Sequence, residues 1–128
     1  MTKPDVQSAG PAFAVETLKK RPDFLKAARS KRQHTDGFVI QCRKRKPEEI
    51  PKTTIRVGYT CSKKVGNAVA RNAAKRRLRE VARQILPSKG IEGHDYVLIG
   101  RHHVTAARPF EDLKRDLERA LSILHPKR

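Results

Sequence analysis

Basic side chains recur along one stretch of the chain at intervals that bring them to the same side of a helix. Four of them follow one another at every fourth residue: Arg71, Lys75, Arg79 and Arg83. A helix has about 3.6 residues per turn, so residues four apart lie on one face. Guanidinium and ammonium groups in such a row bind phosphates, because each contact releases condensed counterions. The spacing therefore predicts a surface for a nucleic-acid backbone.

The other side of this predicted helix is apolar. At about 100° per residue, one face collects the following residues: Ala70, Ala74, Leu78, Val81, Ala82 and Ile85. From Lys63 to Arg83 there are eight Lys or Arg residues and one acid, Glu80. A solvated face usually mixes signs, since each favourable i,i+4 pair stabilises a helix by about 0.2–0.5 kcal/mol. The shortage of acids favours phosphate binding over an ordinary solvated face.

The composition agrees with a polyanionic partner. The chain has 128 residues, and its 30 Lys and Arg against 13 Asp and Glu give a net charge of +17. The acids are too few to neutralise the cations, so most of the excess charge must face solvent or nucleic acid.

The length fits one domain. No apolar run approaches the roughly 18 residues of a membrane span. We expect a cytoplasmic protein that contacts no membrane and is monomeric on its own.

The cysteines and paired histidines do not indicate a metal centre. Cys42 and Cys61 match neither a disulfide framework nor a metal spacing such as C-x-x-C. They suit a reducing compartment, and we expect both to be buried free thiols. His102 and His103 are adjacent, so on a strand they would point to opposite faces.

Periodicity predicts the elements that position the basic helix. We expect a flexible N-terminal tail over residues 1–16 and a single RNA-binding α/β domain over 17–128. The expected elements are a helix at 22–30, strands at 38–45 and 53–61, a helix at 67–86 with Asn67 as its N-cap, a strand at 96–99 and a helix from Pro109. Pro87 and Gly90 should end the long helix, and the first two strands should form a hairpin.

The order helix, strand, strand, helix, strand, helix predicts an α+β fold. We expect a single-domain α/β sandwich in which helices cover a small mixed sheet. The apolar run from Tyr96 to Ile99 indicates a central strand that is buried on both faces. It should pair in parallel with the strand at 53–61, and general statistics make that crossover right-handed. The last helix has a leucine stripe and nearly balanced charges, so we expect a scaffold role without RNA contacts.

The basic segment closely resembles the conserved block of the bacterial ribonuclease P protein component. That block has the pattern Arg-Asn-x-x-Lys-Arg-x-x-Arg after a Lys-Lys loop. Here the matching residues run from Ser62 to Glu80 and include Lys63, Lys64, Arg71, Asn72, Lys75, Arg76 and Arg79. Further similarity lies in Leu18-Lys19-Lys20-Arg21 with Asp23-Phe24, in Phe38-Val39-Ile40 and in Arg56-Val57-Gly58. The matches cover about residues 17–124.

The resemblance implies a subunit of an endoribonuclease particle that removes the 5′ leader from precursor tRNA. The RNA subunit and its Mg²⁺ ions would hydrolyse the phosphodiester bond, so the protein would supply no catalytic side chain and hold no metal tightly by itself. Its partners would be the catalytic RNA and precursor tRNA, not DNA. The family fold is similar to that of some ribosomal proteins and has a left-handed strand-helix-strand crossover, contrary to the general statistics.

The resemblance also implies two sets of binding residues. The catalytic RNA would contact Lys63, Lys64, Arg71, Asn72, Lys75, Arg76 and Arg79. The single-stranded leader would lie in a cleft lined by Phe24, Val39, Gln41 and Arg56. The family often has aromatic residues at the positions of Ala28 and Gln41, so we expect weaker stacking on the leader here. A plain core position beneath the first helix is the alternative for Phe24.

Three other functions share some of these features. An independent nuclease needs clustered carboxylates or histidines to hold cations, whereas the acids here are scattered. A general RNA-binding scaffold, such as a ribosomal protein, has similar size and charge but needs no cleft and no leader-dependent affinity. A DNA-binding regulator would insert the basic helix into a major groove, but no dimerisation heptad accompanies this helix.

Overall fold

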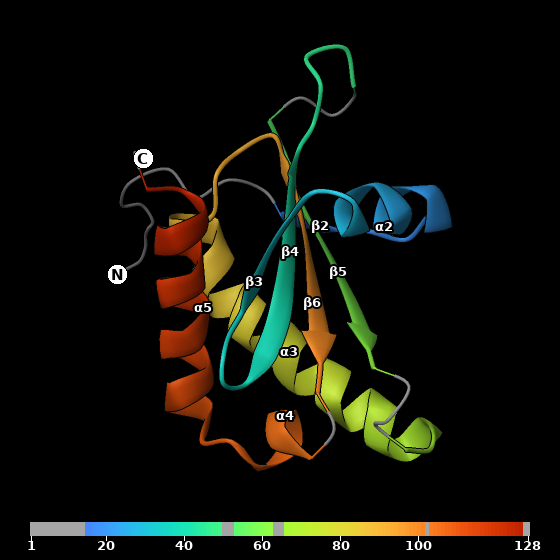
Figure 1. The fold of residues 1–128 in the computed structure, drawn as a ribbon, viewed down its shortest axis with the longest axis vertical. Helices are drawn as coiled ribbons and strands as arrows, with labels where there is room; N and C mark the ends of the chain where they lie inside the picture. Colours follow the sequence, from blue (N-terminus) through green and yellow to red (C-terminus); the bar gives the residue numbers. More distant parts are fainter. Residues whose placement is uncertain (1–14, 50–52, 63–65, 102, 127–128) are drawn as a thin grey trace, which may run out of the picture.

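A five-stranded mixed sheet forms the centre of the molecule (Figure 1). The computed structural model describes residues 15–49, 53–62, 66–101 and 103–126. The strands are β2 (Val15–Thr17), β3 (Lys31–His34), β4 (Phe38–Lys44), β5 (Ile55–Cys61) and β6 (His94–Gly100). The helices are α2 (Arg21–Ala28), α3 (Ala68–Lys89), α4 (Val104–Ala107) and α5 (Phe110–Leu124). The predicted sandwich of helices on a small mixed sheet is confirmed.

β6 is the central strand, as its apolar run predicts. The strand order is β2-β5-β6-β4-β3. β6 pairs in parallel with β5 and antiparallel with β4. A strand with neighbours on both sides and helices on both faces buries nearly every side chain, and Tyr96, Val97 and Leu98 are almost completely inaccessible. The predicted parallel pairing across the strand-helix-strand unit is confirmed.

The predicted hairpin between the strands at 38–45 and 53–61 is wrong. β6 lies between β4 and β5 (Figure 1), because its apolar residues gain most burial in the middle of the sheet. The hairpin partner of β4 is β3, with Lys31 opposite Cys42 and His34 opposite Val39. The Thr35 hydroxyl accepts hydrogen bonds from the backbone N–H groups of Gly37 and Phe38 and closes the turn.

Another strand begins before the predicted domain boundary. β2 contains Val15 and Glu16 and pairs in parallel with β5. It shows no apolar alternation, since Glu16 and Thr17 are exposed. The expected tail is otherwise outside the described residues.

α3 begins as predicted but ends later. The Asn67 side chain accepts a hydrogen bond from the backbone N–H of Ala70 at 3.0 Å and caps the helix. The prediction that Pro87 ends the helix is wrong, because the helix continues to Lys89. A proline in the final turn forfeits one backbone hydrogen bond. The Gly90 N–H still donates to the Leu86 carbonyl at 2.9 Å.

Two apolar layers form on opposite faces of the sheet. The main core joins Ile40, Tyr96 and Leu98 from the strands to Leu78 of α3 and Leu117 of α5. A smaller cluster of Leu18, Ala27 and Val97 lies beneath α2. Alternate residues of β6 thus pack into different apolar layers.

Both cysteines are free and buried, as predicted. Among the described residues, no helix has the length and apolar character to cross a membrane.

We predict that Leu78→Ala destabilises the protein by about 2–5 kcal/mol, because it leaves a cavity in the main core. Leu78 has an exposed fraction of 0%, whereas Val69 on the same helix is 78% exposed. Val69→Ala should therefore change stability by less than about 0.5 kcal/mol. Urea unfolding followed by circular dichroism measures both. Equal losses would contradict the assignment of the helix faces.

Candidate nucleic-acid interface

α3 separates its cations from its apolar residues, as the periodicity predicts. The buried side comprises Ala74, Leu78, Val81, Ala82, Ile85 and Leu86. On the other side, Asn72, Arg76 and Arg79 are exposed, while Arg71 and Lys75 are half-buried. We call these five residues the basic face. Lys63 and Lys64, the other predicted RNA contacts, lie outside the described residues.

The cations of the basic face have no carboxylate partner within the described residues. Further along α3, Arg83 forms an ion pair with Glu80. Arg77 points elsewhere, because its guanidinium donates to the Ala106 carbonyl of α4 at 2.6 Å. Of the four cations spaced at every fourth residue, Arg71, Lys75 and Arg79 thus have no carboxylate partner among the described residues, whereas Arg83 has one.

Arg79 is held by an aromatic ring. Its guanidinium carbon lies 5.2 Å from the centroid of the Tyr59 ring on β5. A guanidinium over a ring face gains a cation–π interaction of about 0.5–1 kcal/mol or more. Burial raises the pKa of Tyr59 to about 12, so the phenol remains neutral at physiological pH. The ring positions this cation without cancelling its charge.

A second candidate surface lies where α2 crosses the other face of the sheet. A cavity of about 480 Å³ opens between them. Its lining combines two cations with apolar and small polar groups: Lys19, Arg21, Phe24, Leu25, Ala28, Gln41, Tyr59, Thr60, Val97 and Ile99. We call this the α2 cleft. Its volume and mixed lining suit an extended chain with flat bases and a charged backbone.

Gly58 allows Phe24 to lie directly on the sheet. A Cβ atom at Gly58 would be 2.5 Å from the Phe24 ring, which is closer than real contacts permit. Phe24 also packs against the small cluster of Leu18, Ala27 and Val97. One ring therefore fills part of the core and lines the α2 cleft, so the two alternatives for Phe24 coexist structurally.

The four predicted leader-binding residues lie on the same face of the sheet but have different surroundings. Phe24 and Gln41 line the α2 cleft. Val39 is buried beside them, opposite Ile99 in the β4–β6 ladder. Arg56 lines a separate cavity. The structure thus brings two of the four into the cleft.

Eight of the ten residues that line the α2 cleft were not among the predicted contacts, among them Lys19, Arg21 and Leu25. Leu25 is 43% exposed on α2, and Lys19 and Arg21 precede it. The basic run around Lys19 was a usable signal, because a cationic rim commonly accompanies a single-strand binding groove. Leu25 carried no such signal, since an isolated apolar residue on a short helix is equally consistent with burial.

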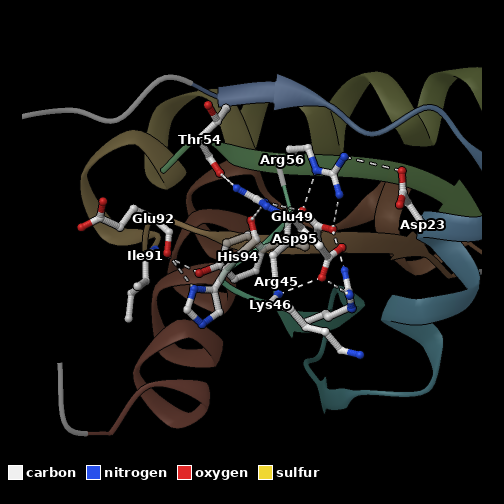
Figure 2. A network of polar contacts seen from close by, with 12 residues as sticks. Asp23, Arg45, Lys46, Glu49, Thr54, Arg56, Ile91, Glu92, His94 and Asp95 are labelled. Atoms are coloured by element: carbon white, nitrogen blue, oxygen red, sulfur yellow. Dashed lines mark hydrogen bonds and ion pairs between the residues drawn. The ribbon is translucent and has the colours of Figure 1, made fainter. Parts of the chain in front are cut away.

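Arg56 belongs to an ionic network centred on a buried carboxylate (Figure 2). Asp95 has a side-chain exposure of 0%. It accepts hydrogen bonds from Arg56 Nε at 2.8 Å, Arg56 Nη2 at 2.7 Å and Arg45 Nη1 at 2.5 Å. Hydrogen bonding to Asp95 raises the pKa of Arg56 above its ordinary value. A buried carboxylate needs such partners, because an unpaired charge in the interior is very costly.

The same network reaches α2 and the loop after β4. Arg56 Nη1 lies 3.5 Å from the Asp23 carboxylate on α2. Arg43 donates to Glu49 at 2.6 Å, and this hydrogen bond lowers the pKa of Glu49 to about 2. Arg56 thus ties the helix above the cleft to the strands below it. The sequence did not reveal this network because its members come from segments far apart in the chain.

Comparisons with a family model and with related proteins all point to one family. A model of the family described as Ribonuclease P matches residues 14–125. The ribonuclease P protein component of Ruegeria pomeroyi is 57% identical over 122 residues, covering 95% of this chain and 96% of that protein. That of Caulobacter vibrioides is 46% identical over 106 residues, covering 83% of this chain and 68% of the relative.

Solved structures show the same fold. The RNase P protein from Thermotoga maritima matches with a TM-score of 0.66 and 29% identity, covering 84% of this chain and 96% of that one. The RNase P protein of Staphylococcus aureus gives a TM-score of 0.65 and 28% identity, covering 84% of this chain and 94% of that one.

We predict that Asp95→Asn destabilises the protein by about 3–5 kcal/mol, because the buried Arg45 loses its ion pair with Asp95 and Arg56 keeps only the more distant Asp23. Asp36→Asn is the matched control. Asp36 is 79% exposed and its nearest cation, Arg108, is 3.8 Å away, so its loss should cost at most about 1 kcal/mol. Chemical denaturation at pH 7 measures both. A loss for Asp95→Asn no larger than for the control would show that the network does not hold the sheet together.

Proposed function

The chain belongs to the ribonuclease P protein family, and from this premise we propose that it is the protein subunit of a ribonuclease P particle, binding the catalytic RNA and the 5′ leader of precursor tRNA. The observation that carries the proposal is the pairing of two surfaces on one fold. The basic face of α3 and the α2 cleft lie on different sides of the sheet, so one polypeptide can contact two RNA segments at once.

In this proposal, the RNA subunit catalyses hydrolysis of the phosphodiester bond. Metal-assisted hydrolysis requires carboxylates that are free to hold cations. Around the cleft, Asp95, Glu49 and Asp23 are engaged by arginines. This supports a protein that binds and positions RNA, with Mg²⁺ acting in the assembled particle.

The basic face is proposed to bind the catalytic RNA. From Arg71 to Arg79 the helix rises about 12 Å at roughly 1.5 Å per residue, so its cations span several phosphates. Packing of the apolar side against the sheet presents these cations together, which reduces the ordering cost on binding. Lys63 and Lys64 are proposed to extend this contact from the preceding loop.

The α2 cleft is proposed to receive the single-stranded leader. Lys19 and Arg21 supply positive charge at its edge, and Phe24 supplies an aromatic surface. Ala28 and Gln41 leave the cleft with less stacking surface than aromatic residues would provide, which favours weaker and less selective stacking. Val39 supports the cleft floor, and Arg56 positions α2 through Asp23.

Reconstitution tests the function directly. Precursor tRNA is incubated with the matching catalytic RNA at low Mg²⁺, with and without the full-length protein, and release of the 5′ fragment is measured. We expect a faster cleavage rate with the protein, because it neutralises phosphates that Mg²⁺ would otherwise have to screen. Equal rates with and without the protein would contradict the proposal.

The triple variant Arg71→Ala, Lys75→Ala, Arg79→Ala should bind the catalytic RNA with a weaker dependence on salt. If each side chain contacts one phosphate, the slope of log affinity against log salt falls in magnitude by about 2 to 3. The control replaces Lys114, Arg115 and Arg119 of α5 with Ala, which removes the same charge from the expected scaffold helix. An unchanged slope in the α3 variant, or an equal change in the control, would argue against the assignment.

Phe24→Ala should weaken binding of precursor tRNA more than binding of mature tRNA in the reconstituted particle. Loss of a stacked base costs about 1–3 kcal/mol, and only the precursor carries a leader. Phe110→Ala on α5 removes another half-buried ring as a control for general loss of packing. Equal losses for the two tRNAs would remove Phe24 from leader recognition and favour a general RNA-binding scaffold.

A further inference from the structure

A thiol and two imidazoles meet at the end of the sheet where α5 finishes. Cys42 lies on β4, His94 begins β6, and His125 follows α5. Their potential ligand atoms all lie within 4.8 Å of one another. Cys42 Sγ is 3.8 Å from His125 Nε2, and the two imidazole rings meet edge to face with centroids 4.9 Å apart. These residues are far apart in sequence, so the sequence contains no metal-binding spacing that would predict this cluster.

The separations are close to those of a tetrahedral zinc centre. Zinc binds thiolate sulfur at about 2.3 Å and imidazole nitrogen at about 2.0–2.1 Å. At tetrahedral angles these bond lengths place neighbouring ligand atoms on the order of 3.3–3.6 Å apart. Small side-chain rotations therefore bring the three groups to bonding distance, without any movement of the sheet.

A backbone carbonyl orients the His94 imidazole as in metal sites. His94 Nδ1 lies 3.0 Å from the Glu92 carbonyl (Figure 2), so it donates its proton there and leaves Nε2 with a lone pair. Ordered outer partners of this kind are typical of metal-ligating histidines. The Tyr96 hydroxyl accepts from the Ile91 N–H at 3.0 Å and lies 2.9 Å from His125 Nε2.

The site is accessible to an ion and to water. A cavity of about 470 Å³ opens onto the cluster and is lined by Ser30, Lys31, Cys42, Lys44, His94 and His125. Burial raises the pKa of the Cys42 thiol to about 12, and the charge of Lys31 partly offsets this. A coordinating metal deprotonates a thiol, and the proton passes to solvent. The two lysines repel a dication but favour the thiolate.

We propose that Cys42, His94 and His125 form a zinc(II) site, with a water molecule as the fourth ligand, that fastens the end of α5 to the sheet. A thiolate with two imidazoles is a donor set that suits zinc. The proposal departs from the sequence-based expectation that the protein holds no metal by itself. The end of α5 and the start of α3 lie far apart (Figure 1), so zinc and RNA can bind independently.

The test uses the full-length protein, freed of metal with a chelator and dialysed against Zn²⁺. We expect one zinc ion per chain, and more than about tenfold weaker binding in His94→Gln and in His125→Gln. Co²⁺ serves as a spectroscopic probe, because a thiolate ligand gives a charge-transfer band in the near ultraviolet. That band should disappear in Cys42→Ser. Cys61→Ser and His34→Gln are matched controls for the other buried thiol and for an exposed histidine.

Stability supplies a second measurement. At a free Zn²⁺ concentration of about 100 times the dissociation constant, the unfolding equilibrium constant should fall by about 100-fold in the wild-type protein and in both controls. In His125→Gln, which should bind zinc more than about tenfold more weakly, it should fall by about tenfold or less. If Cys42→Ser fails to fold, the two histidine variants still decide the question, since both residues are half-buried. Less than one ion per wild-type chain, or equal binding in the histidine variants, would overturn the proposal.

Discussion

The apolar underside of α3 allows like charges to remain together on one helix. Each like-charged i,i+4 pair destabilises a helix by about 0.2–0.5 kcal/mol. Burial of a single Leu, Ile or Val side chain contributes about 1.5–3 kcal/mol. Leu78 and Val81 have exposed fractions of 0%, and Ile85 is 8% exposed. Packing therefore exceeds the repulsion several-fold, and the helix is stable with a single acid among its cations.

The distribution of acids complements this arrangement. Asp95 neutralises arginines within the sheet, and α5 pairs its own charges through Lys114–Glu111 and Arg115–Asp112. On α3 the one acid, Glu80, engages Arg83. The carboxylates thus stabilise the scaffold, whereas the basic face retains its positive charge. That charge has no carboxylate counterpart among the described residues, which supports the proposed contact with RNA phosphates.

The spacing of apolar residues predicted the helices and strands well where one face of an element, or the whole element, is buried. The spacing around Leu78 predicted both faces of α3, and the run from Tyr96 to Ile99 predicted the central strand. Periodicity reports how buried a residue is, but it does not identify the partner that buries it. That is why the sequence failed to show that β6 separates β4 from β5. β3 was missed because its residues are polar and lie at an edge of the sheet.

The candidate sites also differ in how far the sequence could predict them. The basic face lies on one helix, so its spacing was visible in the sequence. Distant segments of the chain form the α2 cleft, the Asp95 network and the cluster of Cys42, His94 and His125. Only the sheet register brings the members of each together. Resemblance to the family selected Phe24 and Gln41 for the cleft. It did not indicate that Arg56 would be engaged by Asp95.

The central claim is that RNA covers the basic face of α3 and leaves α5 free. Lysine acetylation of the protein, alone and bound to the matching catalytic RNA, measures this most directly when followed by mass spectrometry. Lys75 and Lys114 are both half-buried and lie on α3 and α5 respectively, so each serves as the reference for the other. We predict that RNA protects Lys75 from acetylation while Lys114 reacts as in the free protein. Protection of Lys114 with continued reaction of Lys75 would contradict the claim.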